Sequence, residues 1–260
     1  MMISFINFVH KYIHKSEKMK VNFDKVIKEA ILETFPQKKK ASQSAQNLKE
    51  QIECKDEKIQ ESYVVGTKKF ELQTEKLSTE SKQNHQDLMN AYISALNEVS
   101  AKLDTANRDV EGSTSEFRAL KLDETYNLNA AFLHGLYFDN ISDIRSSISK
   151  DQITFMRLER DFGTFDAWQK DFIACCISAR NGWACTVYNS FLKRYMNVVI
   201  DLHSNHVPFA AYPIIVMDCW EHSYTQDFGK DKKAYVFEMM KELNWPKIEE
   251  RIKRIEGSEK

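Results

Sequence analysis

The stretch YPIIVMDCWEHSY, residues 212–224, joins an apolar run to a polar turn, and the fold prediction depends on it. Residues 212–217 have the character of a buried strand, so Asp218 stands at a strand end, where a buried carboxylate can be presented. His222 follows four residues later, which puts both side chains on the same side of a helical turn. An acid and an imidazole placed in this way are candidate metal ligands, although the same spacing is common in plain surface pairs.

Two earlier segments share the strand-like character of residues 212–217. Residues 183–191 and 196–202 follow a period of two, and polar or Pro-containing turns separate them, which predicts a small antiparallel sheet. Upstream, apolar residues recur at the helical period. We predict helices over 79–103, about 125–138, 153–160 and 165–179, with a loop over 105–124. Helical sequence closes the chain from about 232 to 255, with a break near residues 244–246.

These elements predict an α+β fold in three parts. We expect residues 1–62 to be a helical extension, 63–140 a long-helix hairpin domain, and 150–256 a mixed domain in which a three-stranded antiparallel sheet is flanked by helices. The helix over 79–103 should be uninterrupted with His85 and Tyr92 on one stripe, because seven residues fall only about 20° short of two full turns.

Composition narrows the classes of partner and compartment. The chain has 260 residues with 37 basic and 38 acidic side chains, a balance that gives no reason to expect a nucleic-acid partner. No apolar run reaches the length of a membrane span, so we expect no membrane partner. Five cysteines form no Cys-x-x-Cys pair, which favours a reducing, intracellular and cytoplasmic location. The N-terminus is a poor secretory signal, while organelle targeting stays open.

Three of the seven histidines lie on apolar stripes or beside an acid: His85, His134 and His222. Together with Asp218 they would form a nitrogen and oxygen donor set, which suits manganese or iron and lacks the thiolates that favour zinc or copper(I). The alternative for each is a core histidine with one hydrogen-bond partner, which is the commoner role of an imidazole on a helix stripe.

Several short motifs, in order, carry a resemblance to a known family. Residues 217–224, MDCWEHSY, resemble the Asp-x-Trp-Glu-His-x-Tyr signature of the iron/manganese superoxide dismutases. Residues 159–164 and 182–184 are similar to that family's Asp-Phe-Gly-Ser segment and Gly-Trp-Ala strand start. Residues 127–138 resemble its second ligand helix, 78–85 the approach to the first, and 244–245 its late Asn-Trp. The resemblance covers residues 63–250 approximately and does not account for 1–62.

The resemblance implies an enzyme that converts superoxide to dioxygen and hydrogen peroxide with one manganese or iron ion per subunit, the choice of metal being open. It implies four metal ligands: His85, His134, Asp218 and His222. It also implies a homodimer in which Glu221 reaches toward the partner subunit's His222. An apolar wall around the metal would consist of Trp220, Trp183 and Phe138, and Tyr92 would guard the substrate funnel.

Three departures from the family pattern bear on activity. Ala130 occupies one of the two positions from which the family supplies an active-site Gln, and the other falls in a turn where we take His206 as the candidate. The alternative is that His206 is an exposed turn residue. Leu88 or Met89 stands where the family has a relay His, and Thr225 replaces its second Tyr. These losses predict a weaker proton-relay and interface network.

A second hypothesis from another class remains open at this stage. The chain would then be a dismutase-like fold with little activity that acts as an interaction module, docked on a protein partner through residues 1–62. Retention of all four candidate ligands favours the enzyme, because an inactive scaffold has no need of them. Metal content and superoxide turnover of the purified protein distinguish the two.

Overall fold

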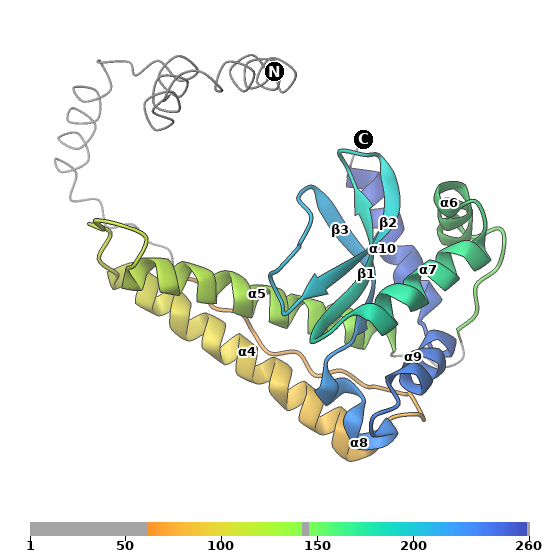
Figure 1. The fold of residues 1–260 in the computed structure, drawn as a ribbon, viewed down its shortest axis with the longest axis horizontal. Coiled ribbons are helices and arrows are strands. Elements are labelled where there is room, and N and C mark those ends of the chain that lie inside the picture. The colour runs from red at the N-terminus through yellow and green to blue at the C-terminus, as the bar shows by residue number, and fades with distance from the viewer. Residues whose placement is uncertain (1–61, 142–145, 259–260) are drawn as a thin grey trace, which may run out of the picture. The chain divides into compact units, whose positions relative to one another are not determined.

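The computed structural model describes residues 62–141 and 146–258 (Figure 1). The chain divides into two compact units, residues 1–58 and 59–260, and the described residues all belong to the second. The predicted helices of the extension lie outside them. The described elements are α4 Thr79–Thr105, α5 Glu116–Asn140, α6 Ile153–Phe162, α7 Phe165–Ser178, β1 Gly182–Asn189, β2 Arg194–Asp201, β3 Ala211–Asp218, the 3-10 helix η1 Glu221–Ser223, α8 Thr225–Phe228, α9 Lys232–Lys241 and α10 Trp245–Ser258.

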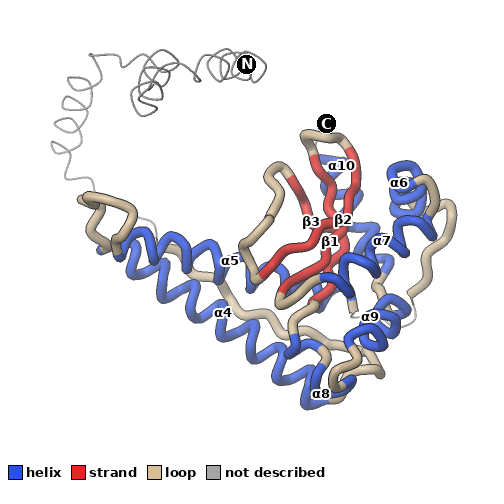
Figure 2. The backbone as a smooth tube through the Cα atoms, in the orientation of Figure 1, coloured by secondary structure: helices blue, strands red, loops and turns tan. Residues whose placement is uncertain are grey.

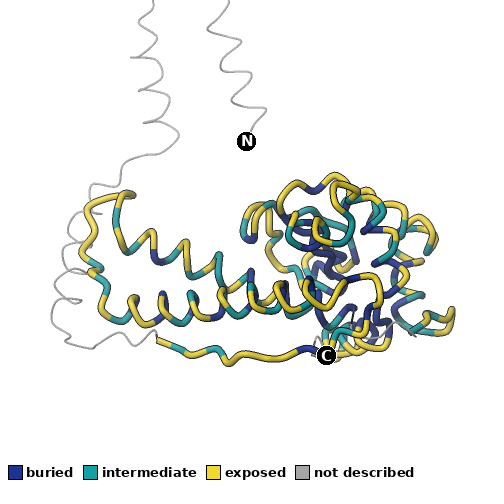
Figure 3. Tube along the Cα trace, turned by 90° about the horizontal axis from the view of Figure 1, so that it is seen from below, coloured by how far each residue is buried: buried dark blue, intermediate teal, exposed yellow. Residues whose placement is uncertain are grey.

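The two long helices α4 and α5 lie side by side and bury the side chains that face each other (Figures 1 and 3). The Ser78 hydroxyl caps α4 by accepting from the backbone N–H of Ser81, and α4 runs without interruption, which confirms the predicted continuous helix. The loop predicted over 105–124 is wrong in its second half. The hydroxyl of Ser115 caps α5, and Leu120 packs against α4, so the helix starts at Glu116.

The three strands form an antiparallel sheet of order β2-β1-β3, as predicted. Trp183 pairs with Asp218 across β1 and β3, so the motif at residues 182–184 lies beside the motif at residues 217–224. Gly182 pairs with Asp201 on the other side. A Cβ on Gly182 would lie 2.0 Å from the carbonyl oxygen of Ile200, so only glycine permits this close pairing. The strands therefore approach one another closely at the end of the sheet that carries Asp218.

Helices cover the sheet and place it against the hairpin helices. α7 packs on β1 and β2, while α5 and α10 pack on β3 (Figure 2). The core between these layers contains large buried side chains such as Trp168 and Phe172 of α7. The arrangement is α+β. Among the described residues, no helix is long and apolar enough to cross a membrane.

Candidate metal centre

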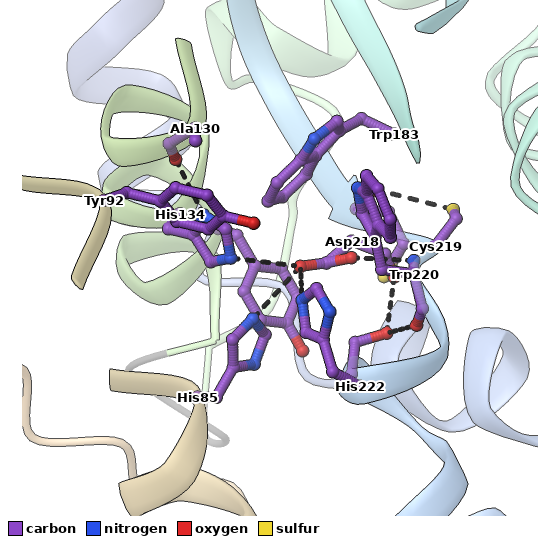
Figure 4. A network of polar contacts seen from close by, with 12 residues as sticks. His85, Tyr92, Ala130, His134, Trp183, Asp218, Cys219, Trp220 and His222 are labelled. Atoms are coloured by element: carbon purple, nitrogen blue, oxygen red, sulfur yellow. Dashed lines mark hydrogen bonds and ion pairs between the residues drawn. The ribbon is translucent and has the colours of Figure 1, made fainter. Parts of the chain in front are cut away.

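Four side chains from four elements meet in one cluster. His85 comes from α4, His134 from α5, Asp218 from the end of β3, and His222 from η1 (Figure 4). One carboxylate oxygen, Oδ2 of Asp218, lies 3.0 Å from Nε2 of His85, 3.2 Å from Nε2 of His222 and 3.7 Å from Nε2 of His134. All four candidate ligand atoms lie within 4.8 Å of one another.

The hydrogen bonds around Asp218 leave Oδ2 as the oxygen that faces the imidazoles. Oδ1 accepts from the backbone N–H of Trp220 at 2.8 Å, and the backbone carbonyl accepts from the Ser223 and Tyr235 hydroxyls. These bonds fix the chain where the strand ends and η1 begins. The carboxylate is therefore oriented by its own loop as well as by the histidines.

The imidazole of His134 provides the test of whether a metal fits. Its Nδ1 lies 2.7 Å from the backbone carbonyl of Ala130, which can only accept, so Nδ1 carries the proton and Nε2 presents a lone pair. That Nε2 is buried without a hydrogen-bond partner. A buried lone pair aimed at a carboxylate and two more imidazoles is poorly satisfied by the protein alone. A divalent or trivalent cation satisfies all four groups.

The ionisation of the cluster also suits a cation. Burial lowers the pKa of His85, and it lowers the pKa of His134 to about 3 together with the nearby His85, so both imidazoles are neutral donors near pH 7. Burial opposes the charge of Asp218, but His222 and His85 hold the pKa of this carboxyl well below its usual range. Burial likewise opposes a charge on His222, yet Asp218 raises its pKa. The cluster holds one anion among nitrogen donors.

Aromatic rings enclose the cluster, and all three predicted wall residues are among them. Trp183 meets His134 edge-on with ring centroids 4.9 Å apart, and Phe138 meets His85 at 4.9 Å. Trp220 stacks on His222 at 5.8 Å. These rings pack apolar surface against the histidines, which strengthens the interactions of the charged groups beside them.

The structure corrects the histidine expected near the substrate. His206 is an exposed turn residue at φ 65°, with its nearest acidic partner Asp201 at 3.9 Å. His203, which the sequence analysis missed, is fully buried beside the cluster. Its backbone carbonyl accepts from Asn129 of α5, and its ring lies 5.9 Å from His134. The sequence did contain a signal for His203: it follows closely after Asp201, at the end of the strand that pairs with Gly182, beside the candidate ligands.

Hydrogen-bond directions around His203 follow from its neighbours. Trp183 Nε1 can only donate, and it lies 3.0 Å from Nδ1 of His203, which must accept. Burial lowers the pKa of His203 to about 4, so the ring is neutral and its one proton lies on Nε2. That proton points at the hydroxyl of Tyr92, 3.1 Å away. The oxygen of Tyr92 accepts from His203, so the Tyr92 proton is directed to another acceptor, and the hydroxyl of Tyr126 is within its reach.

Tyr92 lies where the helix prediction placed it. Its ring is 5.5 Å from His134, on the side of the cluster that His203 closes. Burial raises the pKa of Tyr92 to about 12, assisted by Tyr126 and Asp218. Tyr126 of α5, also missed from the sequence, packs 4.7 Å from His203 and 6.3 Å from Tyr92.

Glu221, the predicted interface residue, is exposed in the single chain and begins η1 next to His222. Its expected contact with the partner subunit stays a prediction. Thr225, which stands where the family has its second Tyr, begins α8.

A helical layer and a small antiparallel sheet that together bring three imidazoles and one carboxylate to a single point define a mononuclear metal protein of the α+β class. Residues 151–251 match the family model described as iron/manganese superoxide dismutases, C-terminal domain. The chain is 30% identical over 162 residues to superoxide dismutase [Mn] 2 of Haloferax volcanii, covering 62% of this chain and 79% of that protein.

Two further relatives agree. Superoxide dismutase [Mn] 1 of Halobacterium salinarum is 29% identical over 171 residues, 66% of this chain and 84% of that protein. Superoxide dismutase [Fe] of Aquifex aeolicus is 29% identical over 167 residues, 63% of this chain and 78% of that protein. The chain belongs to the iron/manganese superoxide dismutase family, which confirms the resemblance seen in its motifs.

Proposed function

We propose that this chain catalyses the dismutation of superoxide to dioxygen and hydrogen peroxide at a mononuclear manganese or iron centre. The observation that carries the proposal is the buried, unpartnered Nε2 of His134 beside Asp218, at a point where two further imidazoles converge. Relatives of both names, [Mn] and [Fe], support the reaction and leave the metal undecided. The interaction-module alternative is not favoured, because it gives no use for this cluster.

The four residues that would hold the ion are His85, His134, Asp218 and His222. When bound, the ion supplies one-electron redox chemistry, accepting an electron from one superoxide and returning one to the next. Asp218 contributes the negative charge that favours a cation over three neutral donors. The rings of Trp183, Trp220 and Phe138 keep water away from the ligands.

We assign the supply of protons to Tyr92, which His203 orients. Each hydrogen peroxide formed consumes two protons. His203 donates its single N–H to the Tyr92 oxygen, which orients the phenol so that its own proton is directed elsewhere. A Gln side chain in the place of His203 would have two N–H groups and could donate to two acceptors, whereas neutral His203 has a single N–H. Tyr92 is therefore the residue we assign to proton donation, and His203 positions it.

We also propose a homodimer, in which Glu221 contacts the partner subunit's His222, and a domain division at about residue 140. The hairpin helices would carry the first two ligands, and the α+β part the last two. The cysteines that the structure describes, Cys175, Cys176, Cys185 and Cys219, are free thiols, which supports an intracellular, cytoplasmic location. In that compartment the activity would be antioxidant.

The decisive experiment measures metal content and superoxide turnover of the purified full chain. Metal-free protein is reconstituted separately with manganese and with iron, and each form is assayed. Turnover with about one ion per subunit supports the enzyme and identifies the metal. Folded protein that binds neither ion, or that binds one without turnover, contradicts the proposal.

A further inference from the structure

A cavity lies where the C-terminal half of α5, the start of β3 and helix α10 pack on one another. Lys68, from the extended segment before α4, also lines it. Its volume is about 380 Å³, which is the size of a small-molecule site. We call it the α5–α10 cavity.

The α5–α10 cavity and the metal cluster lie on opposite sides of α5. Phe132, Leu136 and Asp139 line the cavity at spacings of four and three residues, which places them on one stripe of the helix. His134 is two residues from both Phe132 and Leu136, and two residues turn an α-helix by about 200°. A ligand in the cavity would therefore not touch the metal ligands.

Positive charge exceeds negative charge in the lining of the cavity. The charged residues there are four cations and two acids: Lys68, Lys247, Arg251, Arg254, Asp139 and Glu250. Glu250 pairs with both Lys247, at 3.3 Å, and Arg254, at 2.9 Å. Asp139 is shared in the same way, by Lys68 at 3.4 Å and by Arg251 at 3.6 Å. Because each carboxylate serves two cations, the lining keeps an excess of two positive charges.

Arg251 is the cation that the fold holds in place. Its Nη1 donates to the side-chain oxygen of Asn140 and to the carbonyl of Ile214, and its Nη2 donates to the carbonyl of Leu136 at 3.0 Å. The side chain is only 11% exposed. These bonds leave its Nε–H, for which the described residues provide no partner. A guanidinium fixed in this way loses little freedom when an anion binds to it.

Apolar side chains form the remainder of the lining. Phe132 of α5 and Tyr212 of β3 are 54% and 50% exposed, and Leu136, Pro213 and Ile255 lie with them in the wall. Aromatic rings that keep half of their surface open can stack on a flat group or meet it edge to face. The cavity thus combines an apolar, partly aromatic wall with an excess of cations.

We propose that the α5–α10 cavity binds a small aromatic anion, a molecule in which a planar ring carries an acidic group. The ring would pack against Phe132 and Tyr212, and the acidic group would bind among Lys247, Arg251 and Arg254. An uncharged ring leaves the excess cations unneutralised, and an inorganic anion leaves the aromatic wall in water. Only a molecule with both parts uses the whole lining.

The probe is anilinonaphthalenesulfonate, which joins aromatic rings to a sulfonate, and its uncharged analogue is phenylnaphthylamine. Fluorescence titration of the full, metal-loaded chain should show saturable binding of the sulfonate. Lys247→Glu should weaken that binding by about tenfold, because it removes the excess positive charge, and should change binding of the uncharged analogue by less than about twofold. Tyr212→Ser should weaken binding of both, since both lose a ring contact.

Lys253→Glu is the matched control on the same helix. Lys253 pairs with Glu249 at 3.3 Å, the separation between Lys247 and Glu250, and it is similarly exposed, but it does not line the cavity. This variant should bind both probes as the unchanged chain does. Four results overturn the proposal. They are no saturable binding of the sulfonate, equal loss in Lys253→Glu, equal loss of both probes in Lys247→Glu, and unchanged sulfonate binding in Tyr212→Ser.

Discussion

Replacement of His203 tests the hydrogen-bond chain that orients Tyr92. In His203→Ala, Nε1 of Trp183 loses the imidazole nitrogen that accepts its proton. Because both side chains are fully buried, water does not replace that acceptor. An unsatisfied buried donor of this kind destabilises by about 1–3 kcal/mol. The missing ring leaves a cavity of roughly 60 Å³, which adds about 1.5 kcal/mol at about 24 cal/mol per Å³. We expect a total loss of about 2.5–4.5 kcal/mol in the free energy of unfolding.

His203→Gln is the matched control. The amide oxygen of Gln accepts from Trp183, one amide N–H donates to Tyr92, and the side chain fills most of the space. The loss should stay below about 1.5 kcal/mol, as for volume-conserving changes. Turnover should survive in His203→Gln and fall in His203→Ala, where the Tyr92 hydroxyl is no longer oriented.

The assay is denaturant unfolding of the metal-free proteins, together with superoxide turnover of the metal-loaded forms. The metal-free measurement separates the hydrogen bond from any change in metal affinity. If the two variants lost equal free energy, or if His203→Ala kept full turnover, the assigned hydrogen-bond chain would be incorrect.

Three other perturbations test separate parts of the structure. Asp218→Asn keeps the shape of the side chain and removes its charge, so metal affinity, measured by competition with a chelator, should fall by more than the roughly 10- to 100-fold that partners outside the ligand set contribute; normal metal occupancy would show that the ligand set is wrong. Glu221→Ala should raise the dissociation constant of the proposed dimer at least about tenfold in sedimentation while leaving the unfolding midpoint of each subunit unchanged, because the proposed contact with the partner subunit's His222 loses one member. An unchanged constant removes the assignment. Glu249→Gln should lower the free energy of unfolding by about 1–3 kcal/mol, since its carboxylate accepts from the backbone N–H groups and the hydroxyl at the start of α6. Burial opposes the charge of Glu249, but hydrogen bonds from Thr154 lower the pKa of this carboxyl. The difference in unfolding free energy between the unchanged chain and Glu249→Gln is therefore complete above the ordinary Glu pKa of about 4.3, and it disappears as the pH falls through the lowered pKa of the folded state. A difference that does not depend on pH would refute the carboxylate cap.

Local rules were sufficient for most of the fold. The period of the apolar residues predicts α4, α6 and α7, because the face that a helix buries is set by spacing within a few turns. The period of two predicts all three strands to within a few residues. His85 and His134 could be named as candidate ligands because they lie on periodic faces, Asp218 because it ends a strand, and His222 because it follows that acid by four residues.

Tertiary packing decided the remainder. The start of α5 depends on Leu120 packing against α4, a contact that no local pattern encodes. The choice between His203 and His206 depends on the path of the loop after β2, because a shift of a few residues in an irregular segment changes which side chain is buried. Pairing of Asp201 with Gly182 brings His203 against Trp183 and leaves His206 in solvent. Sequence spacing states which residues can share a face, and only the packed sheet and helices determine which of them meet.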